Sequence, residues 1–254
     1  MKKSFMIKGK IFGESRMLTC VSVIGENKER IIQEISNAIS KGADVIEWRS
    51  DYFSQVRDLE EVTQVLDAIK LETKTTPVIF TCRHGNEGGQ TEVDQRTRLK
   101  LIECALHSKA VDLVDVEMFN GESFLAKVRL LTEEKQKKLI LSYHNFQMTP
   151  QKNFVTNKFL EGQAGGAHMV KVALMPRTPE DVLTLLNAAN EIGKQTELPI
   201  IAISMGELGR ISRIWGEYVG SCLSYVTVEA PSAPGQLAME DFKEAHRLLM
   251  GKGI

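Results

Sequence analysis

The sequence predicts an α/β protein folded as one (β/α)8 barrel domain over residues 1–254. Eight β-rich runs alternate with helix-period stretches, and their starts lie 25 to 34 residues apart. The length of 254 residues also suits this fold, which typically needs roughly 250. A doubly wound open sheet is less suitable because the turn after the first run, GENKER, has only one glycine.

Each expected strand is a short run rich in β-branched and other apolar residues. Residues 4–18 are expected to add a hairpin that closes the bottom of the barrel. The eight barrel strands are expected at 19–25, 44–50, 77–83, 111–119, 138–145, 168–175, 199–206 and 224–230.

The expected helices have apolar residues at helical spacing. Residues 28–42 place Ile31, Ile35 and Ile39 on one stripe, and Gly42 suits the C-terminal end of the helix. Residues 151–163 and 207–220 show a weaker pattern. The other predicted helices are 59–70, 96–109, 122–136, 179–194 and 238–252.

The charge and cysteine content narrow the function classes. The net charge is −1, from 32 basic and 33 acidic side chains that are mixed along the chain, so no basic patch indicates nucleic acid. No stretch approaches the roughly 18 apolar residues of a membrane span. Cys20, Cys82, Cys104 and Cys222 lack C-x-x-C spacing, which argues against a zinc site or a disulfide framework. We expect a cytoplasmic protein without metal, cofactor, nucleic-acid partner or membrane.

Ionisable residues fall at the carboxyl ends of the expected strands. Alternate strand residues point into a barrel, and the layer at the carboxyl ends forms the floor of its active site. Glu47 and Arg49 share one inward face, although they could simply neutralise each other. The residues expected to converge at this end are Glu47, Arg49, Arg83, Glu117, His144 and Lys171.

Lys171 lies between Val170 and Val172 in an apolar strand. Burial can lower a lysine pKa by up to roughly 3–5 units, and the neutral amine attacks a ketone or aldehyde to form an imine. A lysine whose stem lines the barrel and whose head reaches water is the alternative. The protonated imine acidifies the adjacent carbon, so His144 on the neighbouring strand suits proton transfer there. Glu87, in the glycine-rich loop 83–90, is a candidate to orient His144.

Two further segments suit substrate binding. Arg210 and Arg213 supply guanidinium groups that match a carboxylate or a phosphate. Ser232 and Gln236 flank a Pro/Gly turn after the last strand, and the turn suits a lid over hydroxyls and a carboxylate; an ordinary turn before a helix is the alternative.

Several blocks, in order along the chain, resemble the type I 3-dehydroquinate dehydratases of the shikimate pathway. The resemblance extends from about Thr19 to the C-terminal helix. The blocks are EWRSD (47–51), FTCR (80–83), DVEM (115–118), LILSYHN (139–145), VKVALMP (170–176), SMGELGRISR (204–213) and SAPGQ (232–236).

This resemblance implies a barrel, usually dimeric, that removes water from 3-dehydroquinate to give 3-dehydroshikimate without metal or organic cofactor. It implies that Lys171 forms an imine with the substrate ketone, that His144 moves the proton and that Glu87 assists His144. It also implies that Arg213 binds the substrate carboxylate and that Met205 packs against the ring. The remaining implied substrate contacts are Ser22, Glu47, Arg49, Arg83, Ser232 and Gln236.

Two other functions remain open from the sequence. A class I aldolase also carries an imine-forming lysine on a barrel strand, but no glycine-rich phosphate loop stands near the last two strands. A non-catalytic barrel should lack at least one of Lys171, His144 and Arg213, and all three are present.

Overall fold

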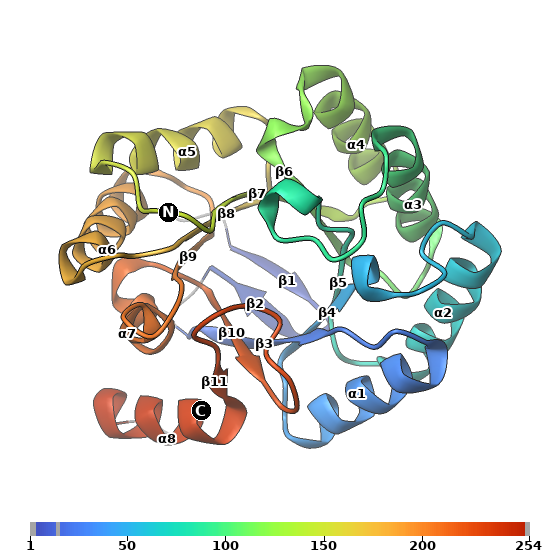
Figure 1. The fold of residues 1–254 in the computed structure, drawn as a ribbon, viewed down its shortest axis with the longest axis horizontal. Helices are drawn as coiled ribbons and strands as arrows, with labels where there is room; N and C mark the ends of the chain where they lie inside the picture. Colours follow the sequence, from blue (N-terminus) through green and yellow to red (C-terminus); the bar gives the residue numbers. More distant parts are fainter. Residues whose placement is uncertain (1–3, 14–15, 252–254) are drawn as a thin grey trace.

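The computed structural model describes residues 4–13 and 16–251. Parallel strands curl around a common axis with helices on the outside (Figure 1). The strands follow the order β10-β3-β4-β5-β6-β7-β8-β9. Their bounds are β3 Leu18–Val23, β4 Val45–Arg49, β5 Val78–Thr81, β6 Leu113–Glu117, β7 Lys138–Asn145, β8 Met169–Leu174, β9 Ile200–Ser204 and β10 Leu223–Thr227.

The sheet closes between β9 and β10. Ile200 forms a parallel bridge with Ser221, and the backbone N–H of Cys222 donates to the carbonyl of Ile200 at 2.9 Å. The backbone N–H of Ala202 donates to Ser221 Oγ at 3.1 Å. The predicted (β/α)8 barrel is therefore confirmed, with a seam held by few hydrogen bonds.

Helices follow the strands as the periodicity predicts, and polar residues cap several of them. Asn27, Asp58 and Asp94 each accept a backbone N–H of the first helical turn, and Thr178 forms a capping box with Asp181. The helices are α1 Lys28–Ser40, α2 Leu59–Glu72, α3 Gln95–His107, α4 Glu122–Glu134, α5 Lys152–Ala164, α6 Pro179–Gln195, α7 Arg210–Trp215 and α8 Met239–Met250.

The expected helix at 207–220 is interrupted. It divides into α7 and a 3-10 turn, η4 Gly216–Val219, with Gly216 at the boundary, where the lack of a side chain weakens a continuous helix. The weak pattern at 151–163, in contrast, forms the full helix α5. Position 252 of the last expected helix lies outside the described residues.

Two apolar layers confirm the alternation of the strands. Val45, Ile79, Leu113, Ile140 and Met169 are fully buried inside the barrel. The residues between them in the strands pack outward against the helices. Each strand therefore presents one face to the barrel interior and the other to a helix.

The N-terminal hairpin closes the amino-terminal end of the barrel, as predicted. β1 Phe5–Ile7 pairs antiparallel with β2 Lys10–Phe12, and Phe12 is fully buried against the inner core. Lys8 forms an ion pair of 2.9 Å with Asp112, just before β6. Residues 14–15 of the expected range 4–18 lie outside the described part of the chain.

The carboxyl-terminal end of the barrel also has short elements that the sequence did not predict. Single 3-10 turns follow three strands: η1 Ser50–Tyr52, η2 Gly85–Glu87 and η3 Met118–Asn120. β11 Leu237–Ala238 pairs in parallel with the end of β10. Within the described ranges, no helix is both long and apolar enough to cross a bilayer.

Candidate active site

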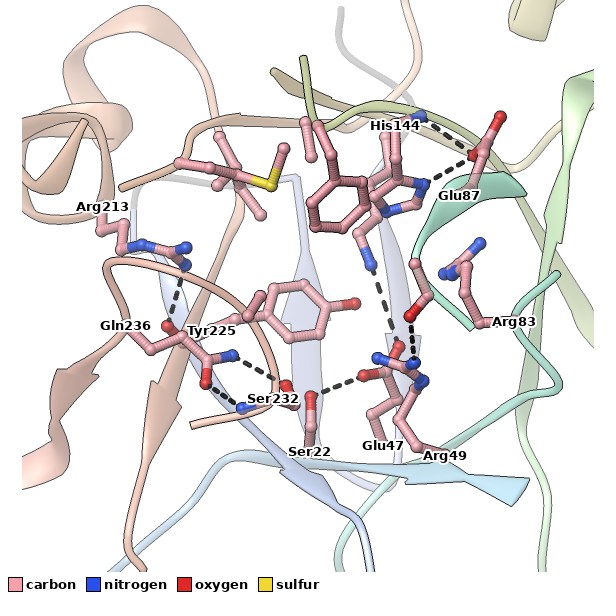
Figure 2. Close-up of a pocket in the computed structure, with 17 residues that line it drawn as sticks. Ser22, Glu47, Arg49, Arg83, Glu87, His144, Arg213, Tyr225, Ser232 and Gln236 are labelled. Carbon is pink, nitrogen blue, oxygen red and sulfur yellow. Dashed lines mark hydrogen bonds and ion pairs between the residues drawn. The ribbon is translucent and has the colours of Figure 1, made fainter. Parts of the chain in front are cut away.

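A pocket opens at the carboxyl ends of the strands (Figure 2). Every site residue that the resemblance implies lines this pocket, whereas Arg210 lies outside it, half exposed and paired with Glu207. The implied residues that line it are Ser22, Glu47, Arg49, Arg83, Glu87, His144, Lys171, Met205, Arg213, Ser232 and Gln236.

Lys171 on β8 is buried between two carboxylates and the ring of Tyr225. Its ammonium donates to Asp115 Oδ2 at 3.2 Å and lies 3.8 Å from Glu47 Oε1. The expectation of an apolar environment was wrong because Val170 and Val172 point to the opposite face of the strand, toward the helices. The neighbours of Lys171 come instead from other strands.

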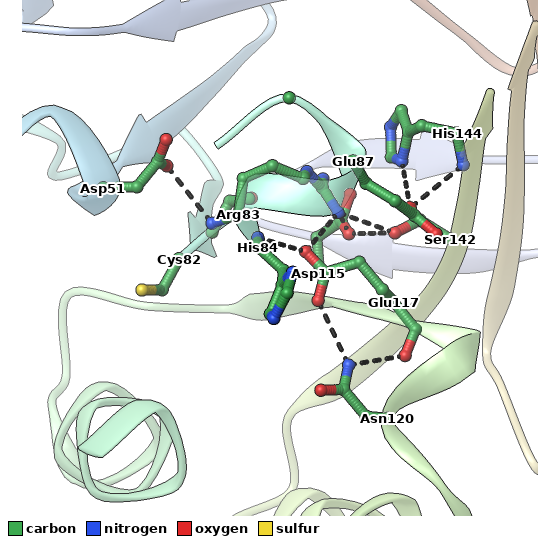
Figure 3. A network of polar contacts seen from close by, with 12 residues as sticks. Asp51, Cys82, Arg83, His84, Glu87, Asp115, Glu117, Asn120, Ser142 and His144 are labelled. Atoms are coloured by element: carbon green, nitrogen blue, oxygen red, sulfur yellow. Dashed lines mark hydrogen bonds and ion pairs between the residues drawn. The ribbon is translucent and has the colours of Figure 1, made fainter. Parts of the chain in front are cut away.

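Asp115 on β6 links Lys171 to a buried ionic network (Figure 3). Arg83 contacts Asp115 and Glu117, each at 2.9 Å, and donates to Ser142 at 2.8 Å. Burial alone would raise the pKa of Asp115, but the charges of Arg83 and Lys171 hold that pKa well below its usual range. Asp115 therefore stays ionised beside the lysine.

Arg98 of α3 extends this network behind the sheet. It pairs with Glu117 and donates to Asn120 Oδ1 at 2.7 Å, although its side chain is almost fully buried. Buried ions are tolerated only when paired and hydrogen-bonded. The network thus balances Lys171, Arg83 and Arg98 against Asp115, Glu117 and Glu47.

Glu47 and Arg49 do not pair directly, because each side chain has other partners. Glu47 accepts hydrogen bonds from Ser22 at 2.6 Å and from Thr81 at 2.9 Å. Arg49 instead makes two hydrogen bonds of 2.8 Å to Asp51. Asp51 lies in the η1 turn, which the sequence did not predict.

His144 on β7 is paired with Glu87. Its ring Nδ1 lies 2.8 Å from Glu87 Oε2, and its backbone N–H donates to the same oxygen at 3.0 Å. Burial, together with Glu117, raises the pKa of Glu87 to about 8 despite the charge of Arg83. Burial and the cations Arg83 and Lys171 lower the pKa of His144 well below its ordinary value, so the imidazole is neutral at neutral pH.

Loop 83–90 is held against the barrel mouth. Asp51 Oδ2 accepts from the backbone N–H of Gln90 at 3.0 Å, and Arg49 donates to the carbonyl of Gly88 at 3.2 Å. Gly88 has a φ of +87° and lies under the ring of Phe146, where a Cβ would come within 2.5 Å of the ring. These contacts fix the position of Glu87.

Arg213 differs from the other arginines of the pocket. It is 2% exposed, and within the described part of the chain it donates only to backbone carbonyls, those of Tyr225 at 3.2 Å and Pro234 at 3.0 Å. Burial lowers its pKa to about 10. Among the described residues it has no acidic partner, so it is a buried cation available to an anionic ligand.

Residues 232–236, here called the SAPGQ loop, cover one side of the pocket. Gln236 accepts from the backbone N–H of Ser232 at 2.8 Å and donates to its hydroxyl at 3.0 Å. The backbone N–H of Gly206 donates to the carbonyl of Pro234 at 3.1 Å, which ties the loop to the segment after β9.

Sequence reasoning missed Asp115 and Tyr225 as site residues. Both follow the alternation that identified the others, since Asp115 stands between Leu113 and Glu117 on one inward face, and Tyr225 follows Leu223. Asp115 was missed because it lies one layer below the strand end. In the described part of the chain, no three His, Cys, Asp or Glu side chains are grouped as they would be to hold a metal.

The fold and the pocket together define a class of protein, the (β/α)8-barrel enzymes with a site at the carboxyl ends of the strands. A family model described as Type I 3-dehydroquinase matches residues 19–252. The chain belongs to the type I 3-dehydroquinase family.

Individual relatives agree with this assignment over the full length. The 3-dehydroquinate dehydratase of Klebsiella pneumoniae (strain 342) is 36% identical over 253 residues, which cover 98% of this chain and 100% of that protein. The crystal structure of 3-dehydroquinate dehydratase from Geobacillus kaustophilus HTA426 has a TM-score of 0.96 at 33% identity, with 99% of each chain covered. Type I 3-dehydroquinate dehydratase from Clostridium difficile, solved with covalently modified comenic acid, has a TM-score of 0.94 at 35% identity, with 98% of each chain covered.

Proposed function

We propose that this chain removes water from 3-dehydroquinate through an imine on Lys171, giving 3-dehydroshikimate. The activity follows from family membership, because the chain is a type I 3-dehydroquinate dehydratase, a hydro-lyase of the shikimate pathway. We propose in addition which residues carry out the reaction. One observation carries this assignment, namely that Lys171, His144 and Arg213 line the same pocket.

The carboxylates beside Lys171 suit an imine that keeps its positive charge. When the amine attacks the substrate ketone and water leaves, the nitrogen becomes a protonated imine at the same place. Asp115, 3.2 Å away and ionised, interacts as favourably with this cation as with the ammonium. The protonated imine then withdraws electrons from the adjacent carbon.

His144 is the proposed proton carrier. With Nδ1 engaged by Glu87, its other ring nitrogen is available to take a proton from the carbon beside the imine. The resulting enamine expels the hydroxyl group, which leaves as water with the proton that His144 returns. A second water then hydrolyses the imine and releases Lys171.

Arg213 is the proposed anchor of the substrate carboxylate. An arginine and a carboxylate form a charge-assisted, two-point hydrogen bond, and Arg213 lacks an acidic partner among the described residues. Arg213 lies across the pocket from His144 (Figure 2). A substrate whose carboxylate binds Arg213 would therefore place its ring between the two residues. The relative from Clostridium difficile was solved with covalently modified comenic acid, which supports covalent chemistry on an organic acid.

Borohydride trapping with 3-dehydroquinate, followed by peptide mass spectrometry, tests these roles. We expect a reduced adduct on Lys171 in the wild type and none in Lys171→Ala. His144→Ala should still form the adduct while its turnover falls by at least about 100-fold, the usual contribution of a general acid–base group. An adduct on another lysine, or full turnover in His144→Ala, would contradict the assignment.

We further propose that the protein is a homodimer in the cytoplasm. This proposal rests on the family resemblance, and sedimentation analysis of the purified chain tests the oligomeric state.

A further inference from the structure

Tyr225 on β10 is a pocket residue to which neither the motifs nor the proposed chemistry assigns a role. Its ring lies across the pocket and is labelled in Figure 2. The ring centroid is 4.1 Å from Lys171 Nζ, so the ring face contacts the reacting nitrogen. The residue is 4% exposed.

The hydroxyl of Tyr225 is buried and has no hydrogen-bond partner among the described residues. The nearby acceptors are already engaged. Glu47 accepts from Ser22 and Thr81, and Asp115 accepts from Ser142 and Lys171. Because a buried hydroxyl without a partner is destabilising, and because the ring that carries it contacts the reacting nitrogen, a partner that arrives with the ligand is expected.

The surroundings of Tyr225 determine the protonation state of its hydroxyl. Burial raises the pKa of the phenol well above its ordinary value, and the charges of Glu47 and Asp115 raise it further, while Arg83 opposes them. Lys171 faces the ring from β8, and Cys20 lies nearby on β3. The phenol therefore stays protonated, and it acts as a hydrogen-bond donor and not as a base.

We propose that Tyr225 is a catalytic residue whose hydroxyl donates a hydrogen bond to the substrate oxygen on the carbon that Lys171 attacks. This inference rests on the imine chemistry proposed above. As the N–C bond forms, the electron pair of the C=O π bond moves to this oxygen, where the hydroxyl stabilises the growing negative charge. Before the attack Lys171 gives up one ammonium proton, which frees the lone pair that forms the N–C bond. When the C–O bond breaks, the oxygen leaves as water with this proton and a second one from the nitrogen, and the third stays on the protonated imine. Tyr225 keeps its own proton throughout.

Tyr225→Phe tests the proposal, because it keeps the ring and its contact with Lys171 and removes only the hydroxyl. We expect the rate of imine formation, measured by rapid mixing and borohydride quenching, to fall about 10-fold or more. The value of kcat/KM should fall by a similar factor. The melting temperature of the free protein should stay the same or rise, because a hydroxyl without a partner is lost. Tyr218→Phe, at a tyrosine that is 59% exposed, is the matched control and should change neither quantity.

The outcomes separate this proposal from the function on which it rests. An unchanged rate of imine formation in Tyr225→Phe, within about twofold, would overturn the catalytic role of the hydroxyl. A loss of activity that merely parallels a lower melting temperature would also overturn it, in favour of a packing role. If the wild type itself forms no adduct on Lys171, the proposed imine chemistry fails first, and the role of Tyr225 falls with it.

Discussion

Glu87 and His144 form a single proton-sharing unit, because their side chains meet at 2.8 Å in a buried site. His144 can accept a proton from the substrate only when its Nδ1–H donates to an ionised Glu87 and leaves the other ring nitrogen free. Since burial raises the pKa of Glu87 to about 8, this form becomes more populated as the pH rises through that value. We expect kcat/KM of the wild type to rise over the same range. In Glu87→Gln the rise should disappear, and kcat/KM should fall about 10- to 100-fold at high pH.

Unfolding measurements give the same substitution a second readout. A carboxyl whose folded-state pKa lies above its ordinary 4.5 contributes stability below about pH 4.5, and this contribution is lost as the pH rises through about 8. Glu87→Gln removes the group that titrates. The free energy of unfolding of the variant, relative to that of the wild type, should therefore increase as the pH rises from about 4.5 to about 8. Urea unfolding at acid and alkaline pH measures the difference. Glu92→Gln, at an exposed glutamate, serves as control, and a gain that does not change with pH would contradict the shift.

At the residue scale, the sequence predicts which side chains point into the barrel but not what they touch. Lys171 and His144 follow from alternation along single strands. The carboxylate at 3.2 Å from Lys171 belongs to Asp115 on β6. Asp115 lies 56 positions earlier in the chain, so no local pattern connects the two residues. Arg49 likewise pairs with Asp51 because of a turn that has no periodic pattern.

Among the elements of the site, the SAPGQ loop depends on a close backbone contact. Gly235 has a φ of +76°, and a Cβ at this position would lie 2.1 Å from the carbonyl oxygen of Gly206. Gly235→Ala must therefore displace the loop and with it Ser232 and Gln236. We expect KM for 3-dehydroquinate to rise about 10-fold or more, because small displacements of binding groups are costly.

Gly121→Ala is the matched control for this prediction. Gly121 also has a positive φ, +83°, but nothing lies within 4 Å of its missing Cβ. Both variants should lose about 1–3 kcal/mol of stability to backbone strain, as thermal unfolding measures. Only Gly235→Ala should raise KM, and an equal effect on KM in both variants would argue against displacement of the loop.

Elements that bury an apolar face were predictable, whereas elements of two or three residues were not. The period of the apolar residues predicts the barrel strands and most helices, since burial of a stripe decides them. The η1, η2 and η3 turns and β11 are too short to have a period. They nevertheless position Asp51, Glu87 and the SAPGQ loop, so the sequence predicted the scaffold of the site better than its rim.

At the scale of the whole molecule, the barrel depends on closure between β9 and β10, its seventh and eighth strands along the chain. Most neighbouring strands share a ladder of backbone pairs, but β9 and β10 meet around Ile200 and Ser221. Ser221 Oγ accepts the backbone N–H of Ala202 at 3.1 Å and so stands in for part of the missing ladder. Because Tyr225 lies on β10 and Lys171 on β8, on the other side of this seam, closure also brings these two pocket residues together.

Ser221→Ala should weaken the seam, since it leaves the buried N–H of Ala202 without its acceptor. We expect a loss of about 1–3 kcal/mol in the free energy of unfolding. Hydrogen exchange should quicken at Ala202 and Cys222 and stay unchanged in β4 and β5. Ser224→Ala is the matched control, because Ser224 is equally buried on β10 but its hydroxyl has no partner among the described residues. Its removal should be neutral or stabilising. If both variants lost the same stability, or if exchange quickened evenly around the barrel, Ser221 would matter only as packing, and the seam would be as firm as the laddered strands.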